Sequence, residues 1–192
     1  MEKDEVLCIF RKAGGLLEGH FLLTSGLHSG QYFQCARVLQ YPRYARILCG
    51  DIAAHFKNEK IDVVIAPAIG GIVVAQEVGR QLKKRTIFAE REKGTMMLRR
   101  GFHIDRGENV LVVEDVITTG GSVREVMDVV TAHEGNIVGI GVIVNRSGRK
   151  ARFKQDFHSV VHLSVVMYSP GSCPYCKEGK PLVKPGSRNI KT

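Results

Sequence analysis

Short β-branched apolar runs alternate along this chain with segments of helical periodicity, and this alternation constrains the fold more than any other feature. Strands are predicted over residues 61–66, 85–89, 110–113 and 137–144, with a fifth over 160–167, because each run is short and bounded by turn residues. Helices are predicted between them, since apolar residues recur there at helical spacing. The pattern predicts an α/β protein whose parallel sheet is covered by helices on both faces.

The length of 192 residues predicts a single domain that spans the whole chain. Amphipathic helices are also expected around residues 6–13 and 44–52, the second with Pro42 in its first turn. Two segments do not fit the sheet. Residues 15–35 are rich in glycine, serine and aromatic residues and predict a separate flap, whereas residues 91–108 are charged and predict a functional lid between two strands.

Composition limits the partners of the chain. The formal net charge of +9 favours an anionic partner without identifying it. A nucleic acid is not expected, because Trp is absent and no predicted helix carries clustered basic residues. No apolar run approaches the roughly 20 residues of a membrane-spanning helix. The acidic N-terminus lacks the order of a signal peptide, so we expect a cytoplasmic protein with no membrane partner.

The most informative segment is residues 110–122, with the sequence VLVVEDVITTGGS. It predicts a buried strand that ends in Glu114 and Asp115, a loop of hydroxyl side chains and glycines, and a helix that begins at about Gly121. Ligands of a parallel sheet bind beyond the carboxyl ends of its strands. Main-chain N–H groups and the helix N-terminus attract a phosphate, whereas the carboxylates require hydroxyl donors or a cation. A ribose 5-phosphate satisfies both requirements.

A simpler interpretation is a strand that ends in solvated acids and a Gly-Ser turn. The full thirteen-residue pattern is more specific than that. It is not a Walker loop, because it lacks Gly-Lys-Thr or Gly-Lys-Ser, and its glycine spacing does not match a dinucleotide fingerprint.

The segment resembles the phosphoribosyl pyrophosphate (PRPP) signature of type I phosphoribosyltransferases, and the chain as a whole resembles the orotate-specific members of that family. The resemblance implies the type I phosphoribosyltransferase fold, a parallel sheet flanked by helices, with an N-terminal hood made of residues 1–35 and part of the C-terminal tail. It implies Asp115 as the catalytic residue and Thr118 and Arg146 as orotate-binding residues. The implied PRPP site comprises Glu114, Asp115, Val116, Ile117, Thr118, Thr119, Gly120, Gly121 and Ser122.

Four further segments carry the resemblance. Residues 19–29, followed by Tyr32 and Phe33, are similar to the hood that covers the base, and residues 66–72 to the loop that binds pyrophosphate. Residues 91–103 are similar to the flexible catalytic loop, and residues 144–148 to the segment whose arginine pairs with the orotate carboxylate. Two lysines that are common in the family are replaced here, by Thr24 and by Gly70. The candidates for the lid cation are Arg91 and Lys93, with Arg99, Arg100 and His103 as further sources of charge.

The implied activity is transfer of the 5-phosphoribosyl group from PRPP to orotate, giving orotidine 5′-monophosphate and pyrophosphate in pyrimidine biosynthesis. The expected cofactor is Mg²⁺, held mainly by substrate oxygens and water with no direct protein metal site. The expected assembly is a homodimer that exchanges its lids between subunits. Two alternatives stay open: a phosphoribosyltransferase for another base such as a purine, and a PRPP-sensing regulator that binds nucleic acid.

The five cysteines, at positions 8, 35, 49, 173 and 176, are expected to be mostly buried thiols. Cys173 and Cys176 have the spacing of half a four-cysteine zinc site, but no second pair at ligand spacing occurs. A free thiol pair is therefore expected. Zinc shared across a dimer and a local disulfide are the alternatives.

Overall fold

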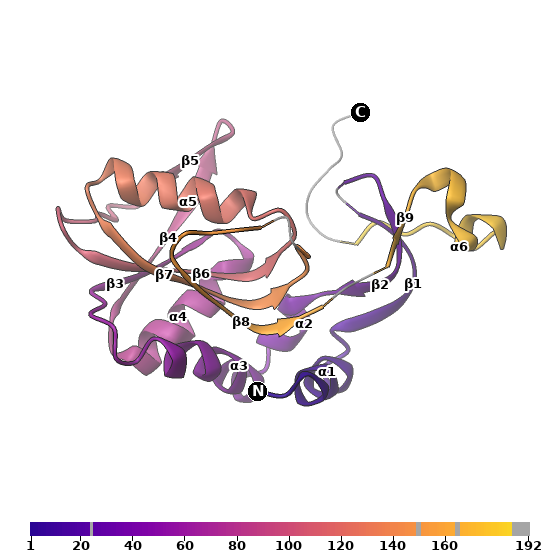
Figure 1. Cartoon of the computed structure of the whole chain (residues 1–192), viewed down its shortest axis with the longest axis horizontal. Coiled ribbons are helices and arrows are strands. Elements are labelled where there is room, and N and C mark those ends of the chain that lie inside the picture. Colours follow the sequence, from indigo (N-terminus) through magenta and orange to yellow (C-terminus); the bar gives the residue numbers. More distant parts are fainter. Residues whose placement is uncertain (24, 149–150, 164–165, 186–192) are drawn as a thin grey trace.

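A six-stranded sheet with helices on both faces forms the body of the molecule (Figure 1). The computed structural model describes residues 1–23, 25–148, 151–163 and 166–185. The strand order is β5-β4-β3-β6-β7-β8, and every neighbouring pair is parallel except β4 and β5. The strands are β3 (Val63–Pro67), β4 (Arg85–Glu92), β5 (Thr95–Leu98), β6 (Asn109–Ile117), β7 (Asn136–Asn145) and β8 (Asp156–His162). The carboxyl ends of the five parallel strands therefore lie along one edge.

Helices α3 and α4 cover one face of this sheet and α5 covers the other (Figure 1). Successive side chains of a strand point to opposite faces, and β3 follows this rule. Val64 and Ala66 pack in the cluster with α3 and α4, whereas Val63 and Ile65 pack in the cluster with α5. The helices are α1 (Lys3–Lys12), α2 (Cys35–Leu39), α3 (Pro42–His55), α4 (Gly70–Leu82) and α5 (Gly121–Ala132). The predicted α/β fold with a largely parallel sheet is confirmed.

Local sequence explains where the helices begin. Pro42 occupies the first turn of α3, where a missing N–H costs nothing. Gly120 caps α5 with φ of 78°, a left-handed conformation that favours glycine. Helix α1 places Val6 and Phe10 in the same apolar cluster as α3, so α1 is packed against the body of the molecule.

A second, smaller sheet stands beside the body (Figure 1). It is antiparallel, with the order β1-β2-β9. Its strands are β1 (Leu16–Leu22), β2 (His28–Phe33) and β9 (Met167–Tyr168), and the chain continues into the short helices η1 (Pro170–Ser172) and α6 (Pro174–Lys177). Val183 then forms a parallel bridge with Phe21 on β1. Residues from both ends of the chain thus build one unit, which we call the hood sheet. Thr24, which replaces a lysine that is common in the family, lies outside the described residues.

Two sequence-based expectations require correction. The fifth predicted strand, 160–167, is wrong in its bounds, because β8 begins at Asp156 and ends at His162, while Met167 belongs to the hood sheet. Strand β8 lies at an edge and tolerates polar residues, so its first half lacks an apolar run. The charged segment 91–108 is not a pure loop: β4 extends to Glu92 and turns back as β5, adding an antiparallel hairpin to the sheet.

Candidate functional site

Two adjacent carboxylates lie near the carboxyl end of β6, as the sequence predicts. Glu114 is buried, with 7% exposure, and Asp115 is half-buried. Each side chain accepts a hydrogen bond from the next main-chain N–H: Glu114 Oε1 from Asp115 at 3.1 Å, and Asp115 Oδ1 from Val116 at 2.7 Å. These two hydrogen bonds help to fix the direction of both carboxylates at the end of β6.

The loop after β6 leads directly into the N-terminus of α5. Thr118 and Thr119 are exposed, and the main-chain N–H of Gly121 donates to Thr119 Oγ1 at 3.4 Å. The first N–H groups of a helix have no partner within the helix, and the helix dipole places partial positive charge there. The geometry of this loop, which we call the phosphate loop (residues 118–122), suits an anion.

The N-terminus of α4 contacts both acids. A Cβ added at Gly70 would lie 2.7 Å from Asp115 Oδ2, and one added at Gly71 would lie 3.1 Å from Glu114 Oε1. The close approach therefore requires glycine at position 70. The turn before it contains a cis peptide bond between Ala68 and Ile69, and Ile69 is 81% exposed. The structure thus brings the predicted pyrophosphate loop, residues 66–72, against the predicted ribose-binding acids.

Arg146 lies at the end of β7, beside β6. Its main-chain N–H donates to the Ile117 carbonyl at 2.8 Å, and its guanidinium lies over the Phe33 ring, with Cζ 5.8 Å from the centroid. Among the described residues, its Nε is the one buried side-chain nitrogen or oxygen atom without a hydrogen-bond partner. A buried guanidinium nitrogen without a partner is costly, so this atom points to a ligand with acceptor oxygens.

Electrostatic coupling confirms that these residues share one environment. Burial lowers the pKa of Arg146, and the Tyr32 and Cys35 charges oppose this shift. Burial raises the pKa of the Cys35 thiol well above its ordinary value, and the Asp115 and Glu114 charges raise it further. Burial also raises the pKa of Tyr32, which Arg146 lowers and Asp115 raises. The hood sheet therefore contributes the end of β2 to the same site as the acids and Arg146.

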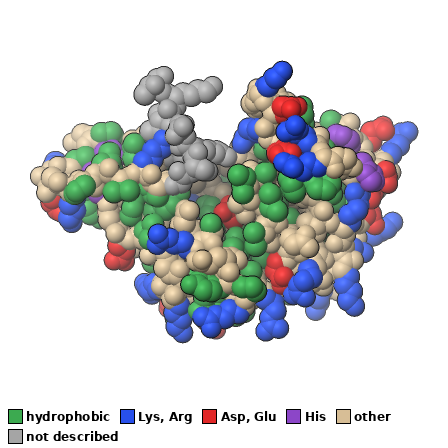
Figure 2. Space-filling model, turned by 180° about the vertical axis from the view of Figure 1, so that it is seen from behind, with side chains coloured by type: hydrophobic (Ala, Val, Ile, Leu, Met, Phe, Trp, Pro, Cys, Tyr) green, Lys and Arg blue, Asp and Glu red, His purple; other side chains and the backbone are tan. Residues whose placement is uncertain are grey.

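The candidate lid residues lie on the β4–β5 hairpin. Arg91 forms an ion pair with Glu125 of α5 at 2.7 Å, and Lys93 is exposed in the turn. Arg99 pairs with Glu92 at 3.1 Å and Arg100 with Glu90 at 2.9 Å. The hairpin forms the projection at the top of Figure 2, where basic and acidic side chains are mixed. The hairpin packs on α5, the helix into which the phosphate loop leads.

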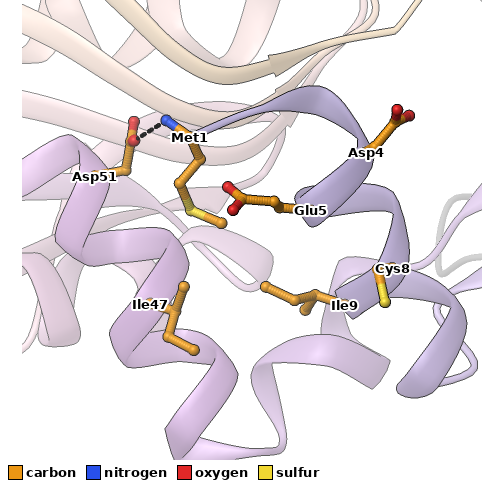
Figure 3. Close-up of a pocket in the computed structure, with 7 residues that line it drawn as sticks. All are labelled: Met1, Asp4, Glu5, Cys8, Ile9, Ile47 and Asp51. Carbon is orange, nitrogen blue, oxygen red and sulfur yellow. Dashed lines mark hydrogen bonds and ion pairs between the residues drawn. The ribbon is translucent and has the colours of Figure 1, made fainter.

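A hollow in the surface lies apart from these residues (Figure 3). It is formed by α1 and α3, and the N-terminal amino group lies there, 2.7 Å from Asp51. Its lining residues are Met1, Asp4, Glu5, Cys8, Ile9, Ile47 and Asp51. None of them belongs to the predicted site, so the hollow does not identify the place of the chemistry.

One residue of the site escapes sequence analysis. Arg124, in the first turn of α5, donates to the Thr119 carbonyl at 2.8 Å and to the Arg152 carbonyl at 3.1 Å. These two hydrogen bonds join the phosphate loop to the segment at Arg152 and help to fix the conformation of the loop. No sequence signal distinguishes Arg124 from an ordinary surface arginine on a helix.

Residues 39–169 match the phosphoribosyl transferase domain family. The chain is also 59% identical over 190 residues to orotate phosphoribosyltransferase of Thermoanaerobacter sp. (strain X514), which covers 99% of this chain and the whole of that protein. The chain belongs to the phosphoribosyltransferase family, among the orotate phosphoribosyltransferases. The family match contains β3, α4, β6, α5 and β7, the elements that position the acids, the phosphate loop and Arg146.

Solved structures agree with this assignment. The crystal structure of orotate phosphoribosyltransferase from Aeropyrum pernix has a TM-score of 0.69 and 25% identity, and the match covers 82% of this chain and 93% of that chain. Adenine phosphoribosyltransferase from Thermoanaerobacter pseudethanolicus has a TM-score of 0.60 and 14% identity, covering 69% of this chain and 88% of that chain. The second likeness concerns the fold alone, so the choice of base depends on the site and on the close relatives.

Among the described residues, no helix has the length and apolar character that crossing a bilayer requires.

Proposed function

We propose that this protein transfers the 5-phosphoribosyl group from PRPP to orotate, releasing pyrophosphate and forming orotidine 5′-monophosphate. The observation that carries the proposal is the buried Arg146 Nε, which lacks a partner among the described residues and lies beside the acids and the phosphate loop. An arginine suits a planar carboxylate, because its fork donates two parallel hydrogen bonds. Orotate carries such a carboxylate, whereas adenine does not.

The 5-phosphate would bind in the phosphate loop. Main-chain N–H groups of Gly120, Gly121 and Ser122, together with the hydroxyls of Thr118, Thr119 and Ser122, would donate to its oxygens. Asp115 and Glu114 would accept hydrogen bonds from the ribose hydroxyls. Val116 and Ile117 connect the acids to the loop through the end of β6. Bound in this way, the ribose would direct its anomeric carbon away from the phosphate loop and toward Arg146.

The reaction is a substitution at the anomeric carbon, in which a ring nitrogen of orotate attacks while the bond to pyrophosphate breaks. Positive charge develops on the ribose, and the adjacent Asp115 carboxylate would stabilise it. Negative charge develops on the leaving group, for which the turn at residues 66–72 offers main-chain N–H groups at the N-terminus of α4. Thr118 would lie between the 5-phosphate and the base.

Phosphoribosyltransferases of this kind generally use Mg²⁺ with PRPP, and the donor set here fits a hard cation. Pyrophosphate oxygens, ribose hydroxyls and water would hold the ion, while Glu114 and Asp115 would bind the ribose hydroxyls and add negative charge nearby. The ion would neutralise charge on the leaving group. We place no separate protein metal site in this chemistry.

Lid closure and assembly belong to the same proposal. The β4–β5 hairpin projects from the sheet edge, and Lys93 and Arg91 would deliver positive charge to pyrophosphate in the active site of a second subunit. Closure would exclude water, which otherwise hydrolyses PRPP. We place the homodimer in the cytoplasm. Nucleic acid is not a proposed partner, since basic and acidic side chains are interspersed on the face seen in Figure 2.

A base-specificity panel tests the function. The full chain is incubated with PRPP, Mg²⁺ and either orotate, adenine or hypoxanthine, and the pyrophosphate released is measured. We expect turnover with orotate alone. Turnover with a purine and not with orotate, or RNA binding without turnover, contradicts the proposal.

A further inference from the structure

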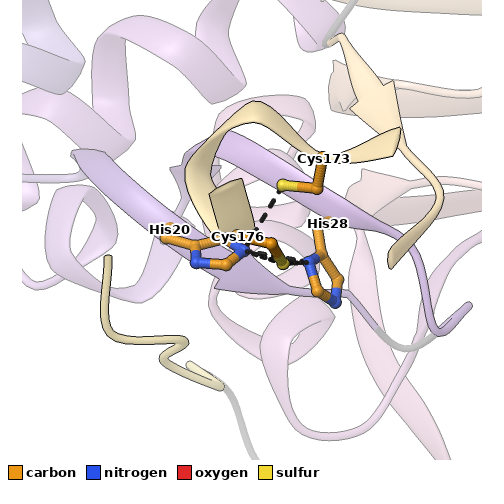
Figure 4. Close-up of side chains that lie close together, drawn as sticks. All are labelled: His20, His28, Cys173 and Cys176. Carbon is orange, nitrogen blue, oxygen red and sulfur yellow. Dashed lines mark hydrogen bonds between the residues drawn. The ribbon is translucent and has the colours of Figure 1, made fainter. Parts of the chain in front are cut away.

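Four metal-ligating side chains from opposite ends of the chain meet in the hood sheet (Figure 4). His20 comes from β1, His28 begins β2, and Cys173 and Cys176 flank the first turn of α6. Their four ligand atoms all lie within 4.8 Å of one another. His20, His28 and Cys173 are buried, whereas Cys176 is exposed.

The distances within the cluster approach those of a tetrahedral site. With zinc–nitrogen bonds of about 2.0–2.1 Å and zinc–sulfur bonds of about 2.3 Å, a nitrogen and a sulfur ligand lie about 3.5 Å apart. His20 Nε2 lies 3.5 Å from Cys173 Sγ and 3.6 Å from Cys176 Sγ. Cys176 Sγ lies 3.2 Å from His28 Nδ1, and the two nitrogens are 2.9 Å apart. The last two distances are slightly shorter than a bound ion requires.

The proton on His20 can be assigned from its other ring nitrogen. Nδ1 lies 2.9 Å from the Lys180 carbonyl, which only accepts, so Nδ1 carries the proton and donates it. Nε2 of the neutral ring then presents a lone pair to the cluster. Histidines that bind metals commonly donate their second N–H to a carbonyl in this way, which fixes the tautomer and the ring orientation.

Pairwise hydrogen bonds leave a conflict in the cluster. If each thiol donated to one imidazole nitrogen, the lone pairs of His20 Nε2 and His28 Nδ1 would face each other 2.9 Å apart. The single lone pair on His20 Nε2 faces three neighbouring ligand atoms, those of His28, Cys173 and Cys176. A zinc ion would satisfy all four ligands at once. The two thiols would release their protons to solvent, and two thiolates would balance the ion's charge, so the site would be neutral.

We propose that His20, His28, Cys173 and Cys176 bind one structural zinc ion. Two thiolates and two imidazoles in a tetrahedral arrangement are a typical zinc donor set, and four protein ligands leave no open position for catalysis. Sequence analysis recognised only the cysteine half of this site, because the two halves are separated by more than a hundred residues and the histidines lack a recognisable motif.

The ion would join the C-terminal tail to the β1–β2 hairpin of the hood sheet. Among the described residues, Phe33 is the one hood-sheet member of the two buried apolar clusters of the body, and Leu16 packs against one of them. The tail contacts the hairpin through the Tyr175 ring, which lies so close to Gly30 that any Cβ there would clash. A unit with so little apolar burial gains much of its stability from a metal. The proposal is independent of which base the enzyme uses.

Metal analysis of the untagged full-length chain, expressed with added zinc and dialysed, tests this. We expect about one zinc per chain by mass spectrometry of the metal, as a single closed site requires. Replacement by cobalt should give the visible bands of a four-coordinate ion and sulfur-to-cobalt charge transfer. Removal of zinc by a chelator should lower the melting temperature and make the tail sensitive to trypsin after Lys177.

Matched variants assign the ligands. Cys176→Ser and His28→Gln should each lose most of the zinc, whereas Cys8→Ser and His133→Gln, at exposed positions outside the cluster, should retain it. If a ligand variant fails to fold, the metal content and the cobalt spectrum of the wild-type chain still show whether the four side chains bind a metal ion. Any of four results would overturn the proposal. The wild-type chain could contain no zinc, contain iron in place of zinc, or form a Cys173–Cys176 disulfide, and the ligand variants could keep their zinc.

Discussion

Arg146 is the residue on which the choice of base depends. Arg146→Ala should raise the KM for orotate by about 10- to 100-fold, since a hydrogen bond to a charged group contributes about 1.5–3 kcal/mol. The KM for PRPP should change little, because Arg146 does not contact the phosphate loop in our proposal. Steady-state kinetics with each substrate varied in turn measure both constants.

The matched control for that experiment is Arg106→Ala, because Arg106 is a surface arginine whose side chain is 82% exposed. Its kinetics should equal those of the wild type. An unchanged KM for orotate in Arg146→Ala would show that Arg146 does not bind the base.

Gly70 controls the position of the Asp115 carboxylate. Gly70→Ala places a methyl group where the Asp115 oxygens now lie, at distances of 2.7 and 3.0 Å. Because Asp115 is also held by the Val116 N–H, the carboxylate must rotate away and lose that hydrogen bond. We expect a rise in the KM for PRPP and a fall in kcat with little change in melting temperature. Gly171→Ala, in open space, is the control.

For single residues, the sequence predicts a functional site well when its residues are contiguous in the chain and poorly when they are far apart. Glu114 and Asp115 precede a glycine-rich turn, and the order of the chain alone places them at the end of a strand. Arg124 acts through carbonyls that only the folded loop brings near it. His20 becomes recognisable only when the tail returns to it. Contacts between distant segments leave no local pattern to detect.

Among the elements, the packing of α3 on β7 depends on two glycines. A Cβ at Gly141 would lie 2.4 Å from Ile52 Cγ2, and one at Gly139 would lie 2.3 Å from the Phe56 ring. Gly141→Ala should destabilise the protein by about 1–3 kcal/mol, the usual cost of overpacking a core. Urea denaturation measures the change in the free energy of unfolding.

A double-mutant cycle identifies the cause of that destabilisation. Ile52→Ala alone should be destabilising, because it leaves a cavity. The double variant Ile52→Ala/Gly141→Ala should lose less free energy of unfolding than the sum of the two single variants, since the new methyl group fills part of the cavity. Strict additivity would show that the two positions do not contact each other.

The predicted elements differ from the observed ones mainly at the sheet edges. Buried strands such as β6 carry apolar side chains on both faces, so the sequence reveals them. Strand β8 mixes Asp156 and His158 with apolar residues because one side of it lacks a neighbouring strand. Strand β9 has two residues, too few for any period, and its pairing with β2 depends on the whole tail.

At the scale of the whole molecule, subunit mixing tests the exchange of lids. One variant, Arg91→Ala/Lys93→Ala, has a defective lid; the other, Asp115→Asn, has a defective pocket. Each alone should be nearly inactive. A hybrid dimer would contain one intact pocket covered by one intact lid, so random mixing should restore about a quarter of wild-type activity in a two-fold symmetric dimer.

Coexpression followed by assay of the unseparated mixture supplies the measurement, with wild-type chains mixed in the same way as the reference. Hybrid dimers separated from that mixture should have about half of wild-type activity. No activity above that of the parent variants would indicate that each pocket is covered by the hairpin of its own chain, or that the chain works alone.

The returning tail has a consequence for the behaviour of the protein in concentrated solution. Strand β9 pairs along β2, and on the other side Val183 exchanges hydrogen bonds of 2.8 Å with the backbone at His20 and Leu22. Unpaired strand edges recruit strands from other molecules and start aggregation. By occupying both flanks of the hairpin, the tail works as a built-in guard against such association, and a chain cut before it would expose both flanks to its neighbours.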